Sequence, residues 1–488
     1  MKKLIRVGTA AAIAALLAGC YVSLDEGAGA VGIQLPPPQS ATGAAIERTG
    51  RIYVINGATL INVGDEAPYA EFDLEPIPGE RLTEYSVGPV PAGPGYRVVV
   101  VFGSYARAGG RGEFFVPASY ALSEEFAVAA GQANETEELT LTDARFAPID
   151  LANTLGRELV GITFVPDVNP LLPGRLYAAT GTRLYEATIP SVDEYGDVAF
   201  AEDYPVPGGR TINSLSLGAD DTGPAVWVNT TRGILVGTGF DGSIMTNSGL
   251  AERSILDSGA LYRLSEHYGY LQFDGGVSAV QNQVGAEPNW LEPADLSEIV
   301  VGRPVYSMDV ERGTTATTGY FATKLGAFRL KEDILGLDLS TVQEIFASEF
   351  TDFFEVEIGG QVATITNVAV VNVPGGDAEH LYVGTPRGAM RIRIAGIGSP
   401  GTDRVEGLLI PQATGQVVKD IVAQGDLIVI VTNHFLLYST NGSAATPVFT
   451  KVPLYASSVG EVTGILVDQV NEIALLSGTG GLVAIQFD

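Results

Sequence analysis

Leu381-Tyr382-Val383-Gly384-Thr385, followed after one residue by Arg387-Gly388-Ala389-Met390, is the stretch that decides the fold. An apolar run ends at a threonine, a tight polar turn follows, and a glycine begins a second apolar run. Short apolar runs separated by such a turn predict two antiparallel strands. The same order recurs seven times after residue 143, with the turns beginning at or beside residues 180, 230, 274, 323, 385, 432 and 477.

The spacing of these pairs predicts a ring of sheets. Successive turns lie 44 to 62 residues apart, and a blade of a β-propeller takes roughly 40 to 50 residues, with about four to eight blades in a ring. We therefore predict an all-β chain with a β-propeller of about seven blades over residues 143–488. One or two β-sandwiches are the alternative, because they too consist of short strands and turns. Apolar runs in the place of a blade's innermost strand precede most pairs, at 159–162, 212–215, 367–370, 419–422 and 463–466.

The last repeat predicts how the ring closes. Phe487-Asp488 follows directly on its third strand, so that sheet would lack a strand and leave an open edge, which is prone to pair with other chains. We expect Asp143–Ala147, which stands just before the first repeat, to fill the gap by pairing with Leu482–Phe487. The longest interval leaves room for a loop or short helix near Ser348–Phe354.

The first residues have the pattern of a secretory signal. Lys2, Lys3 and Arg6 precede a short apolar run that is too short to cross a membrane, since a spanning helix needs about 18 apolar residues or more. Leu17-Ala18-Gly19-Cys20 resembles the bacterial lipobox, and this resemblance implies a signal peptide over residues 1–19 and acylation of Cys20. A buried free cysteine in an uncleaved leader is the alternative. The expected location is the bacterial cell envelope, extracytoplasmic and lipid-anchored, with the inner and the outer membrane both left open.

Residues 20–45 are rich in glycine, alanine and proline, which predicts a flexible tether. Short alternating runs over residues 46–142 then predict a small β-sandwich. Two of its stretches, residues 90–100 and 126–132, resemble the prealbumin-like or carboxypeptidase-regulatory-like modules of bacterial surface proteins. That resemblance implies that this domain is a spacer.

The charge of the chain argues against one class of partner. The net charge is −29, and it becomes −32 without the three cations of the leader, so nucleic acid is not expected as a partner. Cys20 is the only cysteine, which excludes a disulfide within the chain.

No residue pattern points to catalysis or to a cofactor. His267, His380 and His434 are scattered over different repeats without metal-ligand spacing, and the sequence has no nucleophile elbow and no phosphate loop. We therefore predict no catalytic residue, no cofactor and no metal. A calcium site assembled from separate loops and a pair of carboxylates from different blades both stay open.

One further pattern concerns the turns of the repeats. In five of them a cation or histidine follows a threonine, and equivalent turns of a ring would lie on one rim. The hypothesis is a binding rim for an anionic small ligand or an acidic partner protein, because guanidinium groups pair well with carboxylates. The alternative is that exposed turns simply carry polar residues. The rim residues are Arg183, Arg232, Lys324, Arg387 and His434, with Thr180, Thr230, Thr323, Thr385 and Thr432.

The sequence as a whole favours a non-enzymatic lipoprotein that acts as a binding or scaffold platform through its propeller. The alternative is an extracytoplasmic propeller enzyme acting on a small molecule or a glycan. A third possibility is a resemblance to the propeller lipoproteins of outer-membrane assembly, but Trp227 and Trp290 are the only tryptophans, so the tryptophan-marked repeats of that family are absent.

Overall fold

The computed structural model divides the chain into two compact units, residues 1–107 with 112–144 (unit 1) and residues 108–111 with 145–488 (unit 2). Its described residues form an all-β protein, and no helix among them is long and apolar enough to cross a membrane. The leader, Cys20, Trp290 and Lys324 lie outside the described residues. Those residues are 27–34, 49–61, 68–73, 84–107, 113–136, 139–144, 146–149, 158–165, 174–188, 200, 202–219, 224–237, 254–262, 266–273, 276–283, 305–312, 316–323, 326–333, 350–371, 379–394, 407–468 and 472–487.

The described residues of unit 1 form two sheets around one core. Valine and isoleucine side chains from both sheets, among them Val31, Ile52 and Val98, are fully buried against one another. The first sheet has the order β5 (Glu84–Pro91), β1 (Ala28–Gln34), β9 (Ala133–Glu135). The second has the order β10 (Leu141–Asp143), β7 (Glu113–Leu122), β6 (Gly93–Arg107), β2 (Thr49–Asn56), β3 (Thr59–Ile61), with β4 (Ala70–Asp73) on β2 and β8 (Phe126–Val128) on β6.

Strand β1 corrects the predicted tether. It lies within residues 20–45, yet it pairs antiparallel with β5 and parallel with β9. Val31 and Ile33 alternate with half-buried neighbours and are fully buried. The glycine and alanine content favoured a flexible segment, but the period-two burial of these two side chains anchors it in the sheet.

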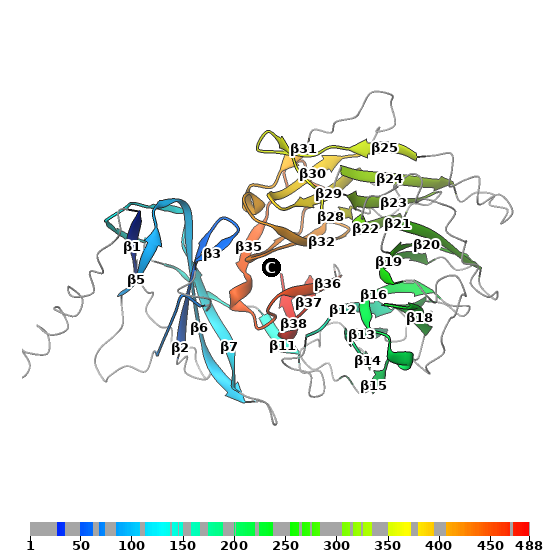
Figure 1. The fold of residues 1–488 in the computed structure, drawn as a ribbon, viewed down its shortest axis with the longest axis horizontal. Helices are drawn as coiled ribbons and strands as arrows, with labels where there is room; N and C mark the ends of the chain where they lie inside the picture. Colours follow the sequence, from blue (N-terminus) through cyan, green and yellow to red (C-terminus); the bar gives the residue numbers. More distant parts are fainter. Residues whose placement is uncertain are drawn as a thin grey trace, which may run out of the picture. The chain divides into compact units, whose positions relative to one another are not determined.

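Unit 2 consists, in its described part, of seven successive antiparallel sheets of three or four strands and one small hairpin, β26 (Glu357–Ile358) with β27 (Gln361–Val362) (Figure 1). The first three sheets are β12 (Gly161–Val165), β13 (Arg175–Thr180), β14 (Arg183–Thr188), β15 (Glu202–Pro205); β16 (Ile212–Ala219), β17 (Pro224–Thr230), β18 (Gly233–Gly237); and β19 (Ile255–Tyr262), β20 (Glu266–Phe273), β21 (Gly276–Gln283).

The last four sheets are β22 (Val305–Arg312), β23 (Ala316–Thr323), β24 (Gly326–Asp333), β25 (Phe350–Phe354); β28 (Asn367–Val370), β29 (His380–Thr385), β30 (Gly388–Arg393), β31 (Gly407–Leu409); β32 (Val418–Gln424), β33 (Leu427–Thr432), β34 (Phe435–Ser439), β35 (Thr450–Pro453); and β36 (Val462–Asp468), β37 (Ile473–Gly478), β38 (Gly481–Gln486), β11 (Phe146–Ile149). Strand β25 occupies the place where a loop or short helix was expected near Ser348–Phe354. Three short 3₁₀ helices, η2 (Pro207–Gly209), η3 (Pro411–Ala413) and η4 (Leu454–Ala456), complete the described elements.

The first strands of the seven sheets contact one another in a closed cycle. Strand β12 contacts β16, and the contacts continue through β19, β22, β28, β32 and β36 back to β12. In Figure 1 the sheets fan outward from these first strands. We refer to this arrangement as the sheet ring. The innermost strands expected from the sequence overlap β12, β16, β28, β32 and β36, with β12 beginning two residues later than expected.

The ring closes as the sequence predicted. Strand β11 pairs antiparallel with β38, placing Phe146 opposite Ile485 and Ile149 opposite Leu482. The closing segment begins later than expected, because Asp143 belongs to β10 of unit 1 and lies opposite Ser119. Closure gives the last sheet its fourth strand and covers an edge that would otherwise be open.

The core of the sheet ring lies between neighbouring sheets. Val226 and Val228 of one sheet pack with Tyr177 and Leu184 of the sheet before it. A sheet that is covered on both faces needs apolar residues at every position rather than at alternate ones. This explains why all six residues of β33 are buried and why its sequence is a continuous apolar run.

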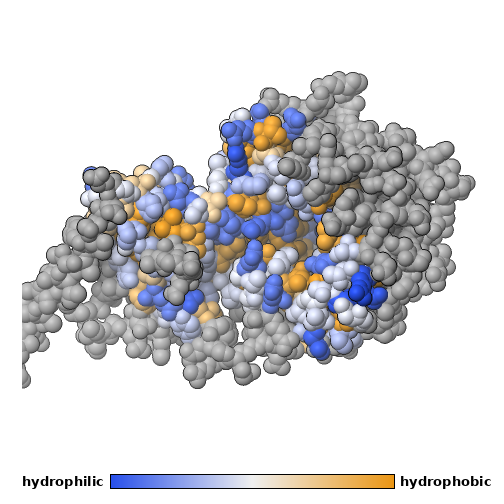
Figure 2. Space-filling view, viewed as in Figure 1, coloured by the Kyte–Doolittle hydropathy of each residue, from blue (hydrophilic) through white to orange (hydrophobic). Residues whose placement is uncertain are grey.

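The described surface of the ring mixes polar and apolar residues (Figure 2). Its exposed large apolar side chains are distributed over several elements, for example Tyr306 of β22, Leu408 of β31 and Val448. Scattered exposed apolar residues are normal in folded proteins, so they do not by themselves mark a binding surface.

Candidate functional site

The first strands of the ring share a local irregularity. In five of them the pairing with the second strand shifts by one residue, at Asn213, Leu256, Tyr306, Lys419 and Thr463. Such a shift is a β-bulge, in which two residues oppose one and the strand bends, so that the following side chain is re-aimed. In the other two first strands, the residue just before the equivalent position makes an additional backbone hydrogen bond to the second strand. Val160 donates to the carbonyl oxygen of Ala179 and Thr366 to that of Gly384, both over 2.8 Å.

The residue after each irregularity occupies the same position in every sheet. It pairs with the second-strand residue that lies one or two places before the turn, as Ser214 does with Asn229 and Asp420 with Val431. All seven are glycine, serine, asparagine or aspartate. We refer to them as the bulge ring: Gly161, Ser214, Asp257, Ser307, Asn367, Asp420 and Gly464.

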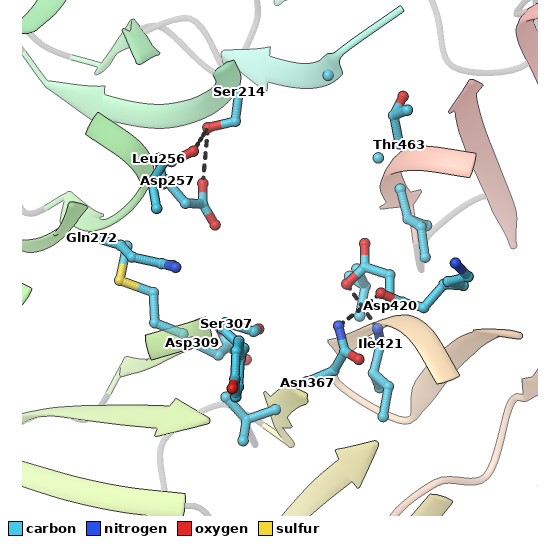
Figure 3. A pocket seen from close by; sticks show the side chains of 18 of the residues that line it. Ser214, Leu256, Asp257, Gln272, Ser307, Asp309, Asn367, Asp420, Ile421 and Thr463 are labelled. Atoms are coloured by element: carbon cyan, nitrogen blue, oxygen red, sulfur yellow. Dashed lines mark hydrogen bonds between the residues drawn. The ribbon is translucent and has the colours of Figure 1, made fainter. Parts of the chain in front are cut away.

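The bulge ring lines a cavity of about 680 Å3 among the first strands of the sheet ring. Gln272, Asp309, Lys419 and Thr463 are also in its wall. Asp257 and Asp420 extend into the cavity from opposite sides (Figure 3). Binding sites for small molecules commonly measure about 300 to 1,000 Å3, so the cavity has the size of such a site.

The two glycines of the bulge ring have no room for a side chain, because neighbouring strands lie close to them. A Cβ atom on Gly161 would lie 3.0 Å from the backbone nitrogen of Leu215 in the next sheet. A Cβ atom on Gly464 would lie 2.9 Å from Oγ of Ser477. The side of the bulge ring between β36 and β16 is therefore narrow, and the larger polar side chains come from the other sheets.

Three carboxylates from three sheets define the charge of the cavity. The hydroxyl of Ser214 donates to Oδ1 of Asp257 over 3.2 Å. The backbone amide of Val370 donates to Oδ2 of Asp309 over 2.7 Å. The backbone amide of Ile421 donates to Oδ1 of Asp420 over 2.8 Å.

The environment of Asp420 makes its carboxyl a weak acid. Burial raises its pKa, and the negative charges of Asp257 and Asp309 raise it further, while the amide of Ile421 opposes the rise. The result is a pKa of about 7. At neutral pH the carboxyl group therefore exchanges its proton readily, as a proton donor, proton acceptor or counter-ion must.

The cationic turn residues lie in a different setting. Arg232 and Arg387 are exposed, and Arg387 donates to Oε1 of Gln361. Arg183 is half-buried. His434 is only 5% exposed, and its Nδ1 forms a 2.6 Å hydrogen bond with the hydroxyl of Tyr455. A binding role for the exposed cations stays a prediction.

The threonines of these turns use their hydroxyl protons within the turn. Four of them are buried and donate to the carbonyl oxygen three residues later, over 2.7 to 3.1 Å. In three of the turns a following backbone amide donates back to the threonine Oγ1, as in Arg387 to Thr385 over 3.0 Å. These hydroxyls are thus not donors to a ligand, and the repeated threonine explains the turn instead. The four are Thr230, Thr323, Thr385 and Thr432, while Thr180 is partly exposed.

Sequence reasoning missed the three cavity carboxylates, although a signal for Asp420 was present. A carboxylate inside a run expected to be an innermost strand, as in Lys419-Asp420-Ile421-Val422, is costly to bury without a purpose. In the described part of the chain, no three His, Cys, Asp or Glu side chains are grouped so as to hold a metal ion.

The comparisons with known proteins give no family. No family model matches the chain, and no curated protein matches its sequence. Among solved structures, the extracellular domain of a putative hybrid two-component system from B. thetaiotaomicron is similar with a TM-score of 0.43 and 13% identity, and the corresponding domain described as a putative one-component system with a TM-score of 0.41 and 12% identity. Each similarity covers 70% of this chain, which spans 40% of the length of those chains.

A crystal structure of BBS1N in complex with ARL6DN, soaked with mercury, has a TM-score of 0.42 and 10% identity. That similarity covers 70% of this chain and 97% of the other. At these scores the similarities do not identify a function for this chain.

Proposed function

We propose that the protein is a lipid-anchored binding protein of the bacterial envelope, and that its ligand is a small polar molecule held in the cavity of the sheet ring. In this proposal the ring is a seven-bladed β-propeller and unit 1 is a β-sandwich spacer. The observation that carries the proposal is the bulge ring, because seven sheets each place one short polar or glycine residue at the same position around a single cavity.

The polar lining supports binding rather than simple packing. A ring centre that served only the fold would be most stable when filled with apolar side chains, since buried polar groups gain little net free energy. Here the centre is open and contains three carboxylates. Groups of this kind are retained where they meet a ligand.

The proposed anchor is tested at Cys20. Cells that produce the full chain are grown with an alkyne-bearing fatty acid, and the protein is isolated and checked for the label. We expect label on the wild-type protein and its recovery in the membrane fraction. The variant Cys20→Ser should carry no label and leave that fraction, and equal labelling of the two proteins would contradict the anchor.

The proposed binding is tested by retention of small molecules. The acylated full chain is incubated in detergent with a metabolite extract and filtered, and the retained molecules are identified by mass spectrometry. The variant Ser307→Trp, which fills the cavity, is the control, and its fold is checked by circular dichroism. We expect at least one molecule to be retained by the wild type and lost with the variant; an identical set from both would contradict binding in the cavity.

The pKa of Asp420 favours a second candidate, an enzyme acting on a small molecule or glycan. A carboxyl group with a pKa of about 7 suits general acid catalysis, and Asp257 and Asp309 lie in the same cavity. This candidate requires that the retained molecule be converted over time by the wild type and not by Asp420→Asn. Recovery of the unchanged molecule after prolonged incubation would exclude it.

A further inference from the structure

Three side-chain donors in the cavity wall are used by the protein itself. The side-chain amide of Asn367 donates to the carbonyl oxygen of Lys419 over 2.8 Å. The hydroxyl of Ser214 shares its one proton between the carbonyl oxygen of Leu256 at 2.8 Å and Oδ1 of Asp257 at 3.2 Å. The hydroxyl of Thr463 donates to the carbonyl oxygen of Leu159 over 2.5 Å. Each of these bonds joins one sheet to its neighbour, so these donors are committed to holding the ring together.

One acceptor in the cavity wall is in the opposite situation. Gln272 is only 4% exposed, and its Nε2 donates to the carbonyl oxygen of Val305, but its Oε1 has no hydrogen-bond partner. The amide lies in the cavity wall near Asp257 (Figure 3). A buried carbonyl oxygen without a partner costs about 1 to 3 kcal/mol, so this atom needs a donor from outside the protein.

The ammonium group of Lys419 in the cavity wall pairs with a carboxylate that does not line the cavity. Lys419 lines the cavity, but its Nζ pairs with Oε1 of Glu461 over 3.3 Å. Asp257, Asp309 and Asp420 line the same cavity, and the negative charges of the first two are one reason why the proton of Asp420 is held tightly.

We propose that the cavity binds a small organic cation with ammonium groups. The ammonium groups pair with Asp257, Asp309 and Asp420, and one N–H bond is donated to Oε1 of Gln272. This inference rests on the proposed binding function and names the class of its ligand. A cation fits these groups better than a neutral polyol, because an ammonium group forms stronger, charge-assisted hydrogen bonds with carboxylates.

The proposal implies coupling to pH. The titratable and charged groups that face Asp420 are Asp257 of β19 and Asp309 of β22, with Lys419 of β32 held by Glu461. A bound cation favours the ionised carboxylate and expels its proton. Affinity therefore rises as the pH rises through about 7, and falls when Asp420 is protonated.

The test uses the full chain in detergent and isothermal titration calorimetry. The probes are 1,5-diaminopentane, the isosteric neutral 1,5-pentanediol, and calcium chloride alone. We expect the diamine to bind at about pH 8, at least about tenfold more weakly at about pH 5.5, and the diol to bind at least about tenfold more weakly than the diamine. Diol binding equal to that of the diamine would overturn the cation and leave the binding function standing.

Variants locate the binding. Asp257→Asn and Asp309→Asn keep the shape of each side chain and an acceptor oxygen, and each should weaken diamine binding by about tenfold or more. Glu379→Gln removes an exposed carboxylate that does not line the cavity and should leave binding unchanged. Circular dichroism checks that each variant is folded.

Three results would overturn the proposal. The first is a diamine affinity that is the same in folded Asp257→Asn and Asp309→Asn as in the wild type. The second is tight binding of calcium alone with no binding of the diamine, which would make the site a metal site. The third is no heat from any probe, and in that case the retention experiment still decides whether the cavity binds another molecule.

Discussion

Two features recur among the seven sheets of the ring, a buried turn threonine in four of them and a backbone position in all seven. At the turn after the second strand the residue repeats, because four buried threonines make the same bond to the carbonyl oxygen three residues later. In the bulge ring the backbone position repeats, while the residue changes among glycine, serine, asparagine and aspartate. The repeated threonine stabilises the turn of the fold. The repeated backbone position in the bulge ring presents different side chains to the cavity.

The largest expected effect comes from a substitution within the bulge ring that changes its structure. Gly161→Val adds a Cβ atom 3.0 Å from the backbone nitrogen of Leu215, and backbone cannot move aside as a side chain can. We expect the free energy of unfolding to fall by about 3 kcal/mol, the upper end for overpacking. Urea unfolding followed by tryptophan fluorescence measures it, since Trp227 lies in the sheet ring.

The matched control places a valine at an equivalent position that already has a side chain. Ser307→Val adds little volume there, so a change below about 1 kcal/mol is expected. Equal losses of stability in the two variants would show that the glycines and the polar members of the bulge ring do not differ in role.

The next effect concerns Asp420 and depends on pH. Its pKa is about 7 in the folded protein against 3.8 for the ordinary group, so between about pH 4 and pH 7 the native state holds a proton that the unfolded chain has lost. Stability from this residue therefore falls as the pH rises through that window and stays low above it. About three pKa units correspond to at most about 4 kcal/mol, and since the side chain lines a cavity we expect about 2 kcal/mol.

The measurement is urea unfolding of the wild type and of Asp420→Asn at several values between about pH 4 and pH 8. The asparagine keeps an oxygen that can accept from the amide of Ile421. The wild type should lose stability relative to the variant as the pH rises. A difference that stays constant over this range would show that Asp420 is not held protonated.

The all-β class and its strand pairs could be predicted from the sequence because strands such as β17 and β33 are buried along their whole length. In a chain whose paired apolar runs recur every 44 to 62 residues, a run such as Leu427–Thr432 predicts a buried strand of a repeated sheet. Strand β1 could not be predicted in this way, because only Val31 and Ile33 among its seven residues are large and apolar, and the surrounding glycines favour a loop. Its partner β9 is about a hundred residues away along the chain.

The candidate site could be predicted only in part. The turn threonines repeat and were found, but their repetition reflects a turn rather than a ligand. The cavity carboxylates differ from sheet to sheet, so no repeat exposes them, and a bulge leaves no mark in residue type. Only the three-dimensional register places Asp257 and Asp420 at the same position, opposite Gln272 and Val431.

A smaller effect is expected at a turn threonine. Thr385→Val keeps the shape of the side chain but removes the 2.9 Å bond to the carbonyl oxygen of Gly388 and the acceptor for the amide of Arg387. The site is fully buried, so two backbone groups lose a partner, and we expect a loss of about 1 to 2 kcal/mol. Urea unfolding measures this loss, and diamine affinity should not change.

Thr180→Val is the matched control, because Thr180 ends the second strand of the first sheet in the same way but is partly exposed. Water can replace a lost partner there, so a smaller effect is expected. A loss of diamine affinity in folded Thr385→Val would instead give the threonine a part in binding.

The smallest effect is expected at the cation that follows this threonine. Arg387→Ala removes an exposed side chain whose bond is to Oε1 of Gln361, and it leaves the backbone amide that donates to Thr385. The free energy of unfolding should stay within about 0.5 kcal/mol, and the affinity for 1,5-diaminopentane should stay the same because Arg387 does not line the cavity. The same variant decides between the two features, since an anionic ligand bound at the turns would lose affinity while a cation bound at the bulge ring would not. If binding of a carboxylate-bearing ligand fell with Arg387→Ala and was indifferent to Asp309→Asn, the rim would be the functional site and the cavity a feature of the fold.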